Sequence, residues 1–402
     1  MSERIEVWLE GRHVGQFVFD EGDVTFVYDE DAPPTPISLS LPRDRPAVRK
    51  AARNFLENLL PEHEQTRARM ANAYGAKSAG AFDLLNAAGG DLAGGLVLLP
   101  EGESLQDRLS ELSPALKRDI ADRISAIKRD SSDTTPRDVA ARFSLAGAQG
   151  KFALAWVDGD WYWSNETVPS THIVKPGNPK YRGIEAAEVA AIDLAYYADI
   201  LAPESEVMSF GDQTAYVVTR FDRTEEPDQL ARRLHAEDIA QSLGLPPEKK
   251  YDVSAGKVIS LLKPIDPSGK LQRVFLSQLI LNVLVGNADA HAKNYSLLLR
   301  PDAISFAPIY DVVPLFLYPE VEQELAMKIG GARRSQEVTP AHWRILAQRI
   351  GFDVDELLAR VREIAEYVGK KNDRVWDALD ADQQVQAREF VARNVERAVQ
   401  IS

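Results

Sequence analysis

A short polar segment, residues 287–294 (NADAHAKN), carries side chains that could take part in phosphoryl transfer. Asp289 could accept the proton of an attacking hydroxyl, while Asn294 and the later Asp311 offer the oxygen ligands that Mg²⁺ prefers. For phosphoryl transfer, a protein must mainly hold the metal, the acceptor hydroxyl and the phosphates in line. The alternative is that these residues only satisfy the hydrogen bonds of a turn.

The neighbouring elements would have to position these side chains. Residues 274–285 have a helical spacing of apolar residues, and Gly286 suits the left-handed end of a helix. Residues 295–299 and 304–308 read as short strands joined by a turn that contains proline and aspartate. Such a hairpin returns the chain to its start, so we expect Asp311 to meet Asn294.

Composition limits the classes of protein to consider. The chain has 402 residues, 45% of them hydrophobic, which predicts two or three domains or lobes. It has no run long and apolar enough for a membrane span, no apolar signal core at its start and no cysteine, so we expect a cytoplasmic protein without disulfides. A net charge of −14 argues against nonspecific binding of nucleic acid by the whole surface.

Four regions follow from the pattern of the chain. Residues 1–100 predict a small α+β unit, with strands at 4–9, 13–19 and 24–28 and helices at 48–60 and 64–74. Residues 101–138 predict a connection with one helix. Residues 139–222 are rich in strands and include a helix at 185–200, and residues 223–402 are mainly helical. The expected fold class is α+β, with the layout of a two-lobed protein kinase, a small β-rich lobe before a larger helical one.

A lysine at the end of a strand could contact phosphates. In the run 170–175, Thr171, Ile173 and Lys175 share one face of the expected strand. Glu188, on the following helix, lies on the apolar stripe of that helix and points inward. We therefore predict an ion pair between Lys175 and Glu188, against the alternative that each is a surface charge.

Two further segments could contact a nucleotide. Residues 144–151 (SLAGAQGK) contain small residues that let backbone approach phosphates, but Leu145 and Phe152 break the P-loop pattern. Residues 217–223 read as an apolar strand that ends in charge, where a kinase hinge would meet adenine. Simple termination of the strand is the alternative.

Six segments stand in the order and spacing of one known family. They are residues 144–151, 171–175 (THIVK), 220–223 (RFDR), 235–238 (HAED), 289–294 (DAHAKN) and 310–311 (YD). The chain resembles the HipA family of toxin kinases over nearly its whole length, including residues 55–62 (FLENLLPE). The resemblance implies a Mg-ATP-dependent serine/threonine protein kinase of a type II toxin-antitoxin system.

The resemblance also implies roles for individual residues. Asp289 is the catalytic base, Lys175 and Glu188 complete the catalytic set, and Asn294 and Asp311 bind Mg²⁺. Ser144 is the loop serine that the enzyme phosphorylates on itself, which inactivates it. The residues expected to line the ATP pocket are Ala146, Gly147, Ala148, Gln149, Gly150, Lys151, Lys175, Thr219, Arg220, Phe221, His291, Lys293 and Tyr310.

The same resemblance implies partners and a substrate class. A HipB-like helix-turn-helix antitoxin would supply the DNA contact, and an aminoacyl-tRNA synthetase, such as glutamyl-tRNA synthetase, would be the protein substrate. Gly150 departs from the family, where Glu often precedes the lysine, which affects the charge and mobility of that loop. Two other functions stay open: a catalytically weak corepressor bound to the antitoxin, and a small-molecule kinase.

Overall fold

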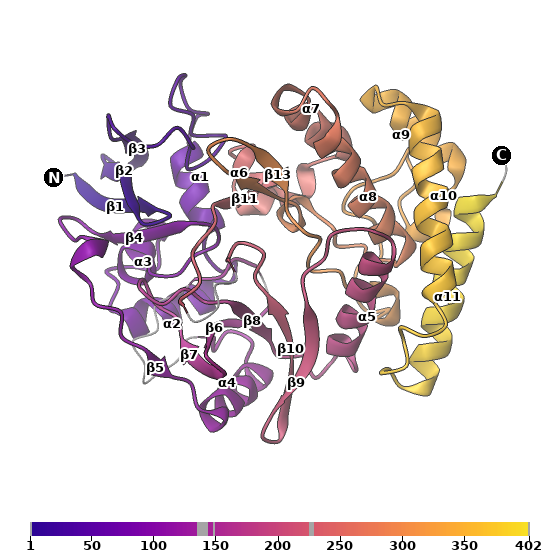
Figure 1. Ribbon diagram of the computed structural model, residues 1–402, viewed down its shortest axis with the longest axis horizontal. Helices are drawn as coiled ribbons and strands as arrows, with labels where there is room; N and C mark the ends of the chain where they lie inside the picture. Colours follow the sequence, from indigo (N-terminus) through magenta and orange to yellow (C-terminus); the bar gives the residue numbers. More distant parts are fainter. Residues whose placement is uncertain (1, 135–143, 148, 225–228, 401–402) are drawn as a thin grey trace. The chain divides into compact units, whose positions relative to one another are not determined.

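The computed structural model describes residues 2–134, 144–147, 149–224 and 229–400 (Figure 1). The chain divides into two compact units. Unit 1 contains residues 1–178, 208–248 and 297–304, and unit 2 contains residues 179–207, 249–296 and 305–402. In the described part of the chain, none of the helices combines the length and apolarity that crossing a bilayer requires.

A four-stranded antiparallel sheet opens unit 1, in the order β3-β2-β1-β4. Its strands are β1 (Glu3–Leu9), β2 (Arg12–Asp20), β3 (Asp23–Tyr28) and β4 (Leu96–Pro100). The first two, which match the strands expected at 4–9 and 13–19, form a hairpin, and Glu10 and Gly11 take the positive φ angles, 50° and 82°, of a two-residue hairpin turn. Strand β4 was not expected from the sequence; it pairs with β1 although almost the whole first region separates the two strands.

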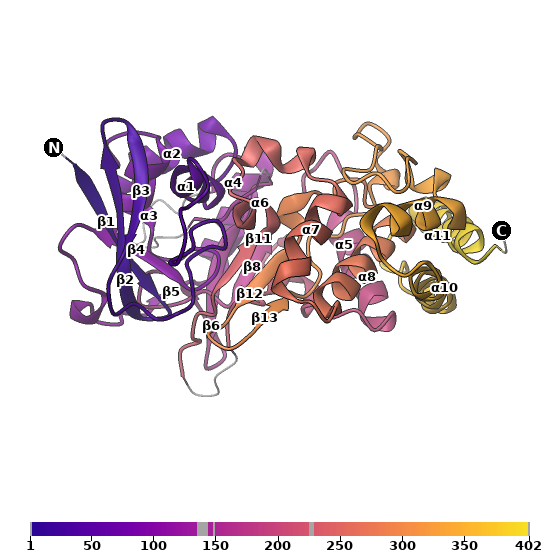
Figure 2. The ribbon, with the colours of Figure 1, turned by 90° about the horizontal axis from the view of Figure 1, so that it is seen from above.

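Three helices complete this first sheet module. They are α1 (Ala51–Asn58), α2 (Glu64–Tyr74) and α3 (Ala81–Ala88), of which the last was not expected from the sequence. Helix α1 packs on β3 and α3 on β4, as Figure 2 shows from above. Phe17 of the sheet stacks on Phe55 of α1 with ring centroids 6.2 Å apart, inside a core of buried apolar side chains. The apolar faces of sheet and helices thus exclude water from one another.

A six-stranded sheet, in the order β5-β7-β6-β8-β10-β9, lies in unit 1 apart from residues 205–207 at the start of β9. Its strands are β5 (Ser113–Pro114), β6 (Phe152–Val157), β7 (Asp160–Trp163), β8 (His172–Lys175), β9 (Ser205–Phe210) and β10 (Gln213–Thr219). Helix α4 (Lys117–Arg129) places Ile120, Ile124 and Ile127 in the core beneath Phe152 and Val174. Strands β6 to β10 lie within residues 139–222, the region that the sequence predicts to be rich in strands.

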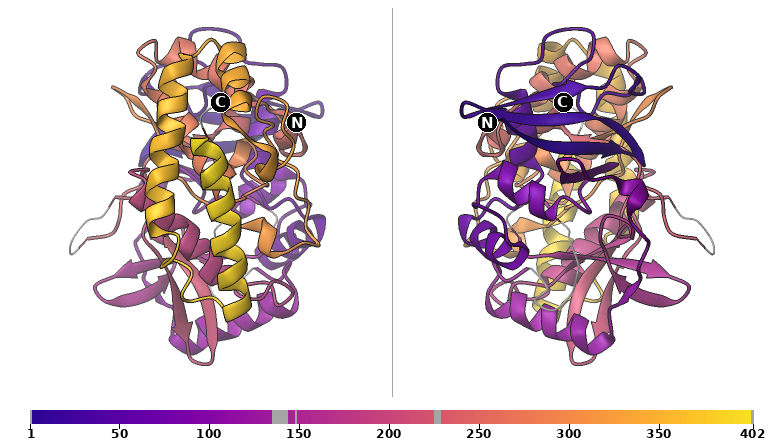
Figure 3. Two further views of the ribbon diagram at one scale, coloured as in Figure 1. Left: turned by 90° about the vertical axis from the view of Figure 1, so that its right-hand side faces the viewer. Right: turned by 90° about the vertical axis from the view of Figure 1, so that its left-hand side faces the viewer.

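Unit 2 is mainly helical. Its helices are α5 (Ile184–Tyr197), α7 (Ala255–Ile265), α8 (Lys270–Leu284), α9 (Pro340–Ile350), α10 (Val354–Lys371) and α11 (Ala381–Val399). Helix α10 contacts α5, α8, α9 and α11, and Figure 3 shows α10 and α11 side by side in gold and yellow. Trp343 of α9 and Trp376, which follows α10, are fully buried. Helices α7 to α11 lie within residues 223–402, the region that the sequence predicts to be mainly helical.

A small sheet and short helical turns make up the rest. Strands β11 (Ala236–Asp238), β12 (Ser296–Leu299) and β13 (Ile304–Phe306) form a sheet in that order, and β11 was not expected. Helix α6 (Ile239–Ser242) begins at Asp238 with a capping box. The single turns are η1 (Leu105–Asp107), η2 (Pro247–Asp252), η3 (Ala292–Asn294), η4 (Leu315–Leu317) and η5 (Ser335–Glu337). The expected α+β class is confirmed.

Candidate active site

The end of α8 sets the position of the catalytic loop. Gly286 has a φ of 69°, and a Cβ there would lie 2.6 Å from Phe390 and 2.7 Å from Phe316, so only glycine fits. The next residue, Asn287, donates to Asn282 Oδ1 at 2.8 Å and to the carbonyl of Asp311 at 3.2 Å. Its side chain therefore ties the end of the helix to the segment that carries Asp311.

Within the loop, Asp289 is exposed while its neighbours on both sides are buried. The backbone N–H of His291 donates to the carbonyl of Asp289 at 2.7 Å and to Asn294 Oδ1 at 3.0 Å. The N–H of Asn294 returns a bond of 3.0 Å to the carbonyl of His291. These local bonds fold residues 289–294 into a tight turn that presents the carboxylate of Asp289 to solvent.

The β12–β13 hairpin brings Asp311 back to this loop, as the sequence predicts. The hydroxyl of Tyr310 donates to the carbonyl of Lys293 at 2.7 Å and also contacts Ser296 Oγ at 2.7 Å. One residue further, Asp311 Oδ2 accepts a hydrogen bond of 2.8 Å from Asn294 Nδ2. Asp311 has a φ of 58°, a left-handed conformation that is costly outside glycine and typical of functional sites.

Asn294 and Asp311 fit a Mg²⁺ ion in the chemistry of their donors. An ionised carboxylate and an amide carbonyl are hard oxygen ligands, and the amide oxygen has a second lone pair beside the one that His291 uses. In the described residues, no three His, Asp or Glu side chains gather closely enough to hold a metal by themselves. A protein site of this type relies on phosphate and water oxygens for the other ligands of Mg²⁺.

The side chain of Tyr251 contacts the same loop, and the sequence did not predict this contact. It lies in η2, and its hydroxyl donates to Asp289 Oδ1 at 2.8 Å. Its ring meets the ring of His291 edge-on, with centroids 5.1 Å apart. No spacing rule connects residues 251 and 289, so the sequence offered no signal for this contact.

In unit 1, the loop that begins at Ser144 is packed inward. The Ser144 side chain is buried, its Oγ donates to the carbonyl of Leu59 at 2.9 Å, and its N–H donates to the carbonyl of Asp91 at 3.0 Å. Gly147 takes a φ of 113° and accepts a bond of 3.3 Å from the N–H of Glu62. Ala148, another predicted contact of ATP, lies outside the described residues.

The packing around residue 150 explains why this chain has glycine where the family often has glutamate. A Cβ at this position would lie 2.6 Å from the carbonyl oxygen of Ser131 and 2.7 Å from Ile127 Cγ2. A glutamate could not be placed there without moving the loop or the end of α4. The absence of a side chain is therefore what allows this loop to pack against α4.

Lys175 and Glu188 are both buried, at 6% and 2% exposure. Lys175 ends β8 and places its Nζ 5.3 Å from the centre of the Tyr216 ring, a cation–π contact. Glu188 lies on the inner side of α5, as its place on the apolar stripe indicated. Lys175 belongs to unit 1 and Glu188 to unit 2, so their pairing stays a prediction.

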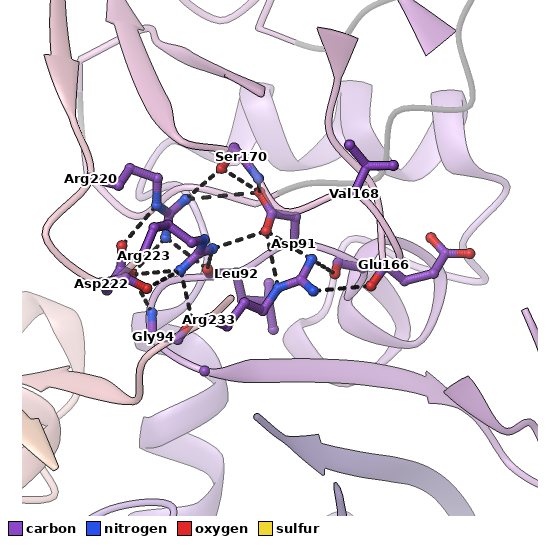
Figure 4. Close-up of polar contacts among 12 residues, drawn as sticks. Asp91, Leu92, Gly94, Glu166, Val168, Ser170, Arg220, Asp222, Arg223 and Arg233 are labelled. Carbon is purple, nitrogen blue, oxygen red and sulfur yellow. Dashed lines mark hydrogen bonds and ion pairs between the residues drawn. The ribbon is translucent and has the colours of Figure 1, made fainter. Parts of the chain in front are cut away.

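The segment after β10 contributes to a cluster of buried charged side chains that the sequence did not predict (Figure 4). The Asp91 cluster consists of Asp91, Arg220, Asp222, Arg223 and Arg233, whose side chains are at most 9% exposed. Asp91 Oδ1 lies 2.9 Å from Arg223 Nη2 and 3.1 Å from Arg233 Nη2. Burial favours the neutral acid, but these guanidinium groups outweigh it and hold the pKa of Asp91 below its ordinary value.

Asp222 anchors the other side of the Asp91 cluster. It accepts bonds of 2.7 Å from Arg220 Nη2 and 2.6 Å from the N–H of Gly94, and its pKa is lowered because Arg220 and Arg223 outweigh the effect of burial. Burial and the neighbouring Arg220 lower the pKa of Arg223 to about 10. The side chain of Arg220, a predicted contact of ATP, is thus committed to this cluster. The N–H of Arg220 donates to the carbonyl of Thr171 at 2.8 Å.

The comparisons with known proteins identify the family. A family model described as the HipA-like C-terminal domain matches residues 143–376, and one described as the HipA N-terminal domain matches residues 5–99. The chain belongs to the HipA family. Within unit 1, Asp91 comes from the N-terminal domain and Arg220 from the C-terminal domain, so the Asp91 cluster joins the two HipA domains.

Individual relatives agree with this assignment. The chain is 34% identical over 390 residues to "putative kinase Y4mE" of Sinorhizobium fredii, covering 93% of this chain and 92% of the relative. It is 30% identical to the "serine/threonine-protein kinase toxin HipA" of Shewanella oneidensis, with 90% and 86% covered. As a HipA-family member, this chain is a serine/threonine protein kinase.

A solved structure matches the whole fold. The HipA chain of the Shewanella oneidensis complex of HipA, HipB and operator DNA aligns with a TM-score of 0.82. The alignment covers 98% of this chain and 96% of that one, at 26% identity. This match confirms the kinase-like HipA fold that the six sequence segments indicated.

Proposed function

We propose that this chain is the toxin of a type II toxin-antitoxin system and uses Mg-ATP to phosphorylate serine or threonine in another protein. The single observation that carries the proposal is the contact of Asn294 with Asp311, 2.8 Å long, on the loop that presents Asp289. Asn294 and Asp311 would hold Mg²⁺, which would neutralise phosphate charge. Asp289 would accept the proton of the attacking hydroxyl.

The proposal includes the nucleotide contacts that the family resemblance implies. Lys175 and the backbone of residues 146–151 and 219–221 would contact phosphates and adenine. Because the side chain of Arg220 is engaged in the Asp91 cluster, residue 220 would contribute its backbone carbonyl. His291, Lys293 and Tyr310 would also line the nucleotide site, and Glu188 would hold Lys175.

Self-inactivation at Ser144 is the second part of the proposal. The buried Ser144 hydroxyl, bonded to the carbonyl of Leu59, cannot receive a phosphate where it lies, so the loop must first move outward. A phosphate there adds about −1.5 to −2 charges at pH 7. It could not return to a pocket that offers a carbonyl oxygen, and it would also repel the phosphates of ATP. The modified loop would therefore stay out, and the affinity for ATP would fall.

The partners in the proposal follow from the family. The solved HipA relative is bound to HipB and operator DNA, which supports a HipB-like helix-turn-helix antitoxin for this chain. With a net charge of −14, this chain is suited to contact DNA through that partner. The protein substrate would be an aminoacyl-tRNA synthetase in the cytoplasm, glutamyl-tRNA synthetase or another, and its phosphorylation would arrest translation and growth.

Incubation with labelled ATP tests the proposal. The protein and its Asp289→Gln variant would each be incubated with Mg-ATP labelled on the γ-phosphate and a cell lysate, before gel separation and mass spectrometry. We expect a labelled lysate protein only with the parent. Label in small molecules alone would indicate a small-molecule kinase, and no label beyond that of the Asp289→Gln variant would indicate a corepressor without turnover.

A further inference from the structure

Tyr251 makes the hydrogen bond that an acceptor hydroxyl would need. Its hydroxyl donates to Asp289 Oδ1 at 2.8 Å, from a different segment of unit 2. A general base in phosphoryl transfer must itself accept a hydrogen bond from the hydroxyl whose proton it removes. The phenolic hydroxyl of Tyr251 therefore occupies a place on the carboxylate that an incoming serine, threonine or water would use.

The environment of Tyr251 allows the side chain to leave. The residue is 51% exposed, so rotation of its ring opens no cavity in the core. One side of its ring meets two buried residues: the edge of the His291 ring, with centroids 5.1 Å apart, and Lys250 Nζ, 5.2 Å from the Tyr251 ring centre.

The backbone around Tyr251 is held by other groups. In the η2 turn, Lys249 pairs with Asp252 at 2.8 Å. After the turn, Val253 is buried, and Ser254 caps α7 by accepting a bond from the N–H of Lys257. The hydroxyl of Tyr251 is thus not needed to hold the turn, and its bond to Asp289 can break and form without unfolding of the turn.

We propose that Tyr251 is a gate at the acceptor site: its hydroxyl covers the carboxylate of Asp289 until an acceptor hydroxyl displaces it. The proposal rests on the role of Asp289 as the base in the proposed function. A gate of this type disfavours water as the acceptor, because replacing the hydrogen bond from the Tyr251 hydroxyl by one from water gains little free energy. A protein substrate adds contacts around its serine or threonine and so competes better.

Hydrolysis of ATP measures the gate directly, with water as the acceptor. In that reaction the water oxygen bonds to the γ-phosphorus, the bond to the ADP oxygen breaks, and Asp289 takes the proton from water. Tyr251→Phe removes the competing hydroxyl and leaves the ring. We expect hydrolysis at saturating Mg-ATP to rise by about threefold to tenfold, the range for loss of one hydrogen bond at a partly exposed site.

The pH dependence of the hydrolysis rate distinguishes a gate from a purely structural role of Tyr251, because a structural role would leave it unchanged. Without Tyr251, the carboxylate of Asp289 loses a donor that stabilises its ionised form. The acid limb of the pH–rate profile should therefore move to higher pH in Tyr251→Phe. Tyr367→Phe is a matched control, because Tyr367 on α10 is 40% exposed and has Lys370 Nζ 5.2 Å from its ring centre. Its rate and profile should equal those of the parent.

The outcomes separate the gate from the proposed function. Faster hydrolysis and a shifted acid limb in Tyr251→Phe, with both lost in the double variant that also carries Asp289→Asn, would establish the gate. An unchanged or slower rate in Tyr251→Phe, beside Asp289-dependent hydrolysis by the parent, would overturn the gate and leave the kinase intact. Hydrolysis by the parent that equals that of Asp289→Asn would overturn both.

Discussion

The amide of Asn294 donates a hydrogen bond of 2.8 Å to the carboxylate of Asp311, across a hairpin that separates the two residues in sequence. The contact pairs the two oxygen-bearing side chains proposed to bind Mg²⁺. The backbone of Asp311, which adopts a φ of 58°, is held by the hydrogen bond of 3.2 Å from Asn287 Nδ2 to its carbonyl.

Asp311→Asn should weaken the use of Mg²⁺ without disturbing the fold. Asparagine tolerates the left-handed conformation of residue 311 but removes the charge. We expect the Mg²⁺ concentration for half-maximal phosphotransfer to rise by at least about tenfold. A Mg²⁺ titration checks this, with Asp302→Asn, in the turn of the same hairpin, as the control. An unchanged Mg²⁺ requirement in Asp311→Asn would remove residue 311 from the metal site.

Ser144→Ala should preserve the affinity for ATP during incubation. After incubation with Mg-ATP, the parent should carry a phosphate and bind ATP more weakly, while the variant cannot be modified at that position. The dissociation constant for ATP, measured before and after incubation, checks this. Equal losses of affinity in parent and variant would exclude a regulatory role for Ser144.

Asp91→Asn should strongly destabilise unit 1. The change leaves three buried arginines with one aspartate, and loss of one partner of a buried ion pair costs about 3–5 kcal/mol. The free energy of unfolding from urea titration checks this. Asp122→Asn, on the exposed side of α4, is the control and should stay within about 0.5 kcal/mol of the parent. A similar small change in both variants would contradict a stabilising role for the Asp91 cluster.

Glu237→Gln should flatten the dependence of stability on pH. Burial raises the pKa of Glu237 to about 7, and its Oε1 accepts a hydrogen bond of 2.9 Å from the N–H of Leu39. Because the pKa is higher in the folded state, the contribution is fully present below about pH 4.5 and is lost as the pH rises through about 7. The parent should lose up to about 3 kcal/mol from this group between pH 5 and pH 8.

The measurement is the free energy of unfolding of both proteins across that pH range. Glutamine keeps the shape but cannot ionise, so the difference between the two curves isolates Glu237. His235, whose pKa burial lowers to about 4, affects both curves alike. Parallel curves would show that Glu237 titrates equally in the folded and unfolded chain.

Gly150→Ala should loosen the loop that carries Ser144. The added Cβ would meet the carbonyl of Ser131, and overpacking of this type costs about 1–3 kcal/mol or displaces the segment. We expect faster proteolytic cleavage between residues 144 and 151. Gly256→Ala, on α7, is the control because its added Cβ would have neighbours no closer than 3.7 Å. Equal cleavage of the loop in both variants would show that residue 150 has room for a side chain.

The sequence by itself determined the elements that depend on neighbouring residues. Alternation of apolar side chains located the first hairpin, and the apolar stripe with Gly286 placed the end of α8 before Asp289. A proline-containing turn between two short strands was enough to predict that Asp311 returns to Asn294. Each of these signals lies within a few residues of its element, so the sequence contains it directly.

Only the tertiary structure decided which distant residues meet. Tyr251 reaches Asp289 from 38 residues away, and Asp91 binds Arg223 across 132 residues. Such contacts have no sequence period, because they arise when separate elements pack their apolar faces and enclose the polar groups between them. The same packing explains Gly150, whose missing side chain becomes necessary only where α4 and the Ser144 loop come together.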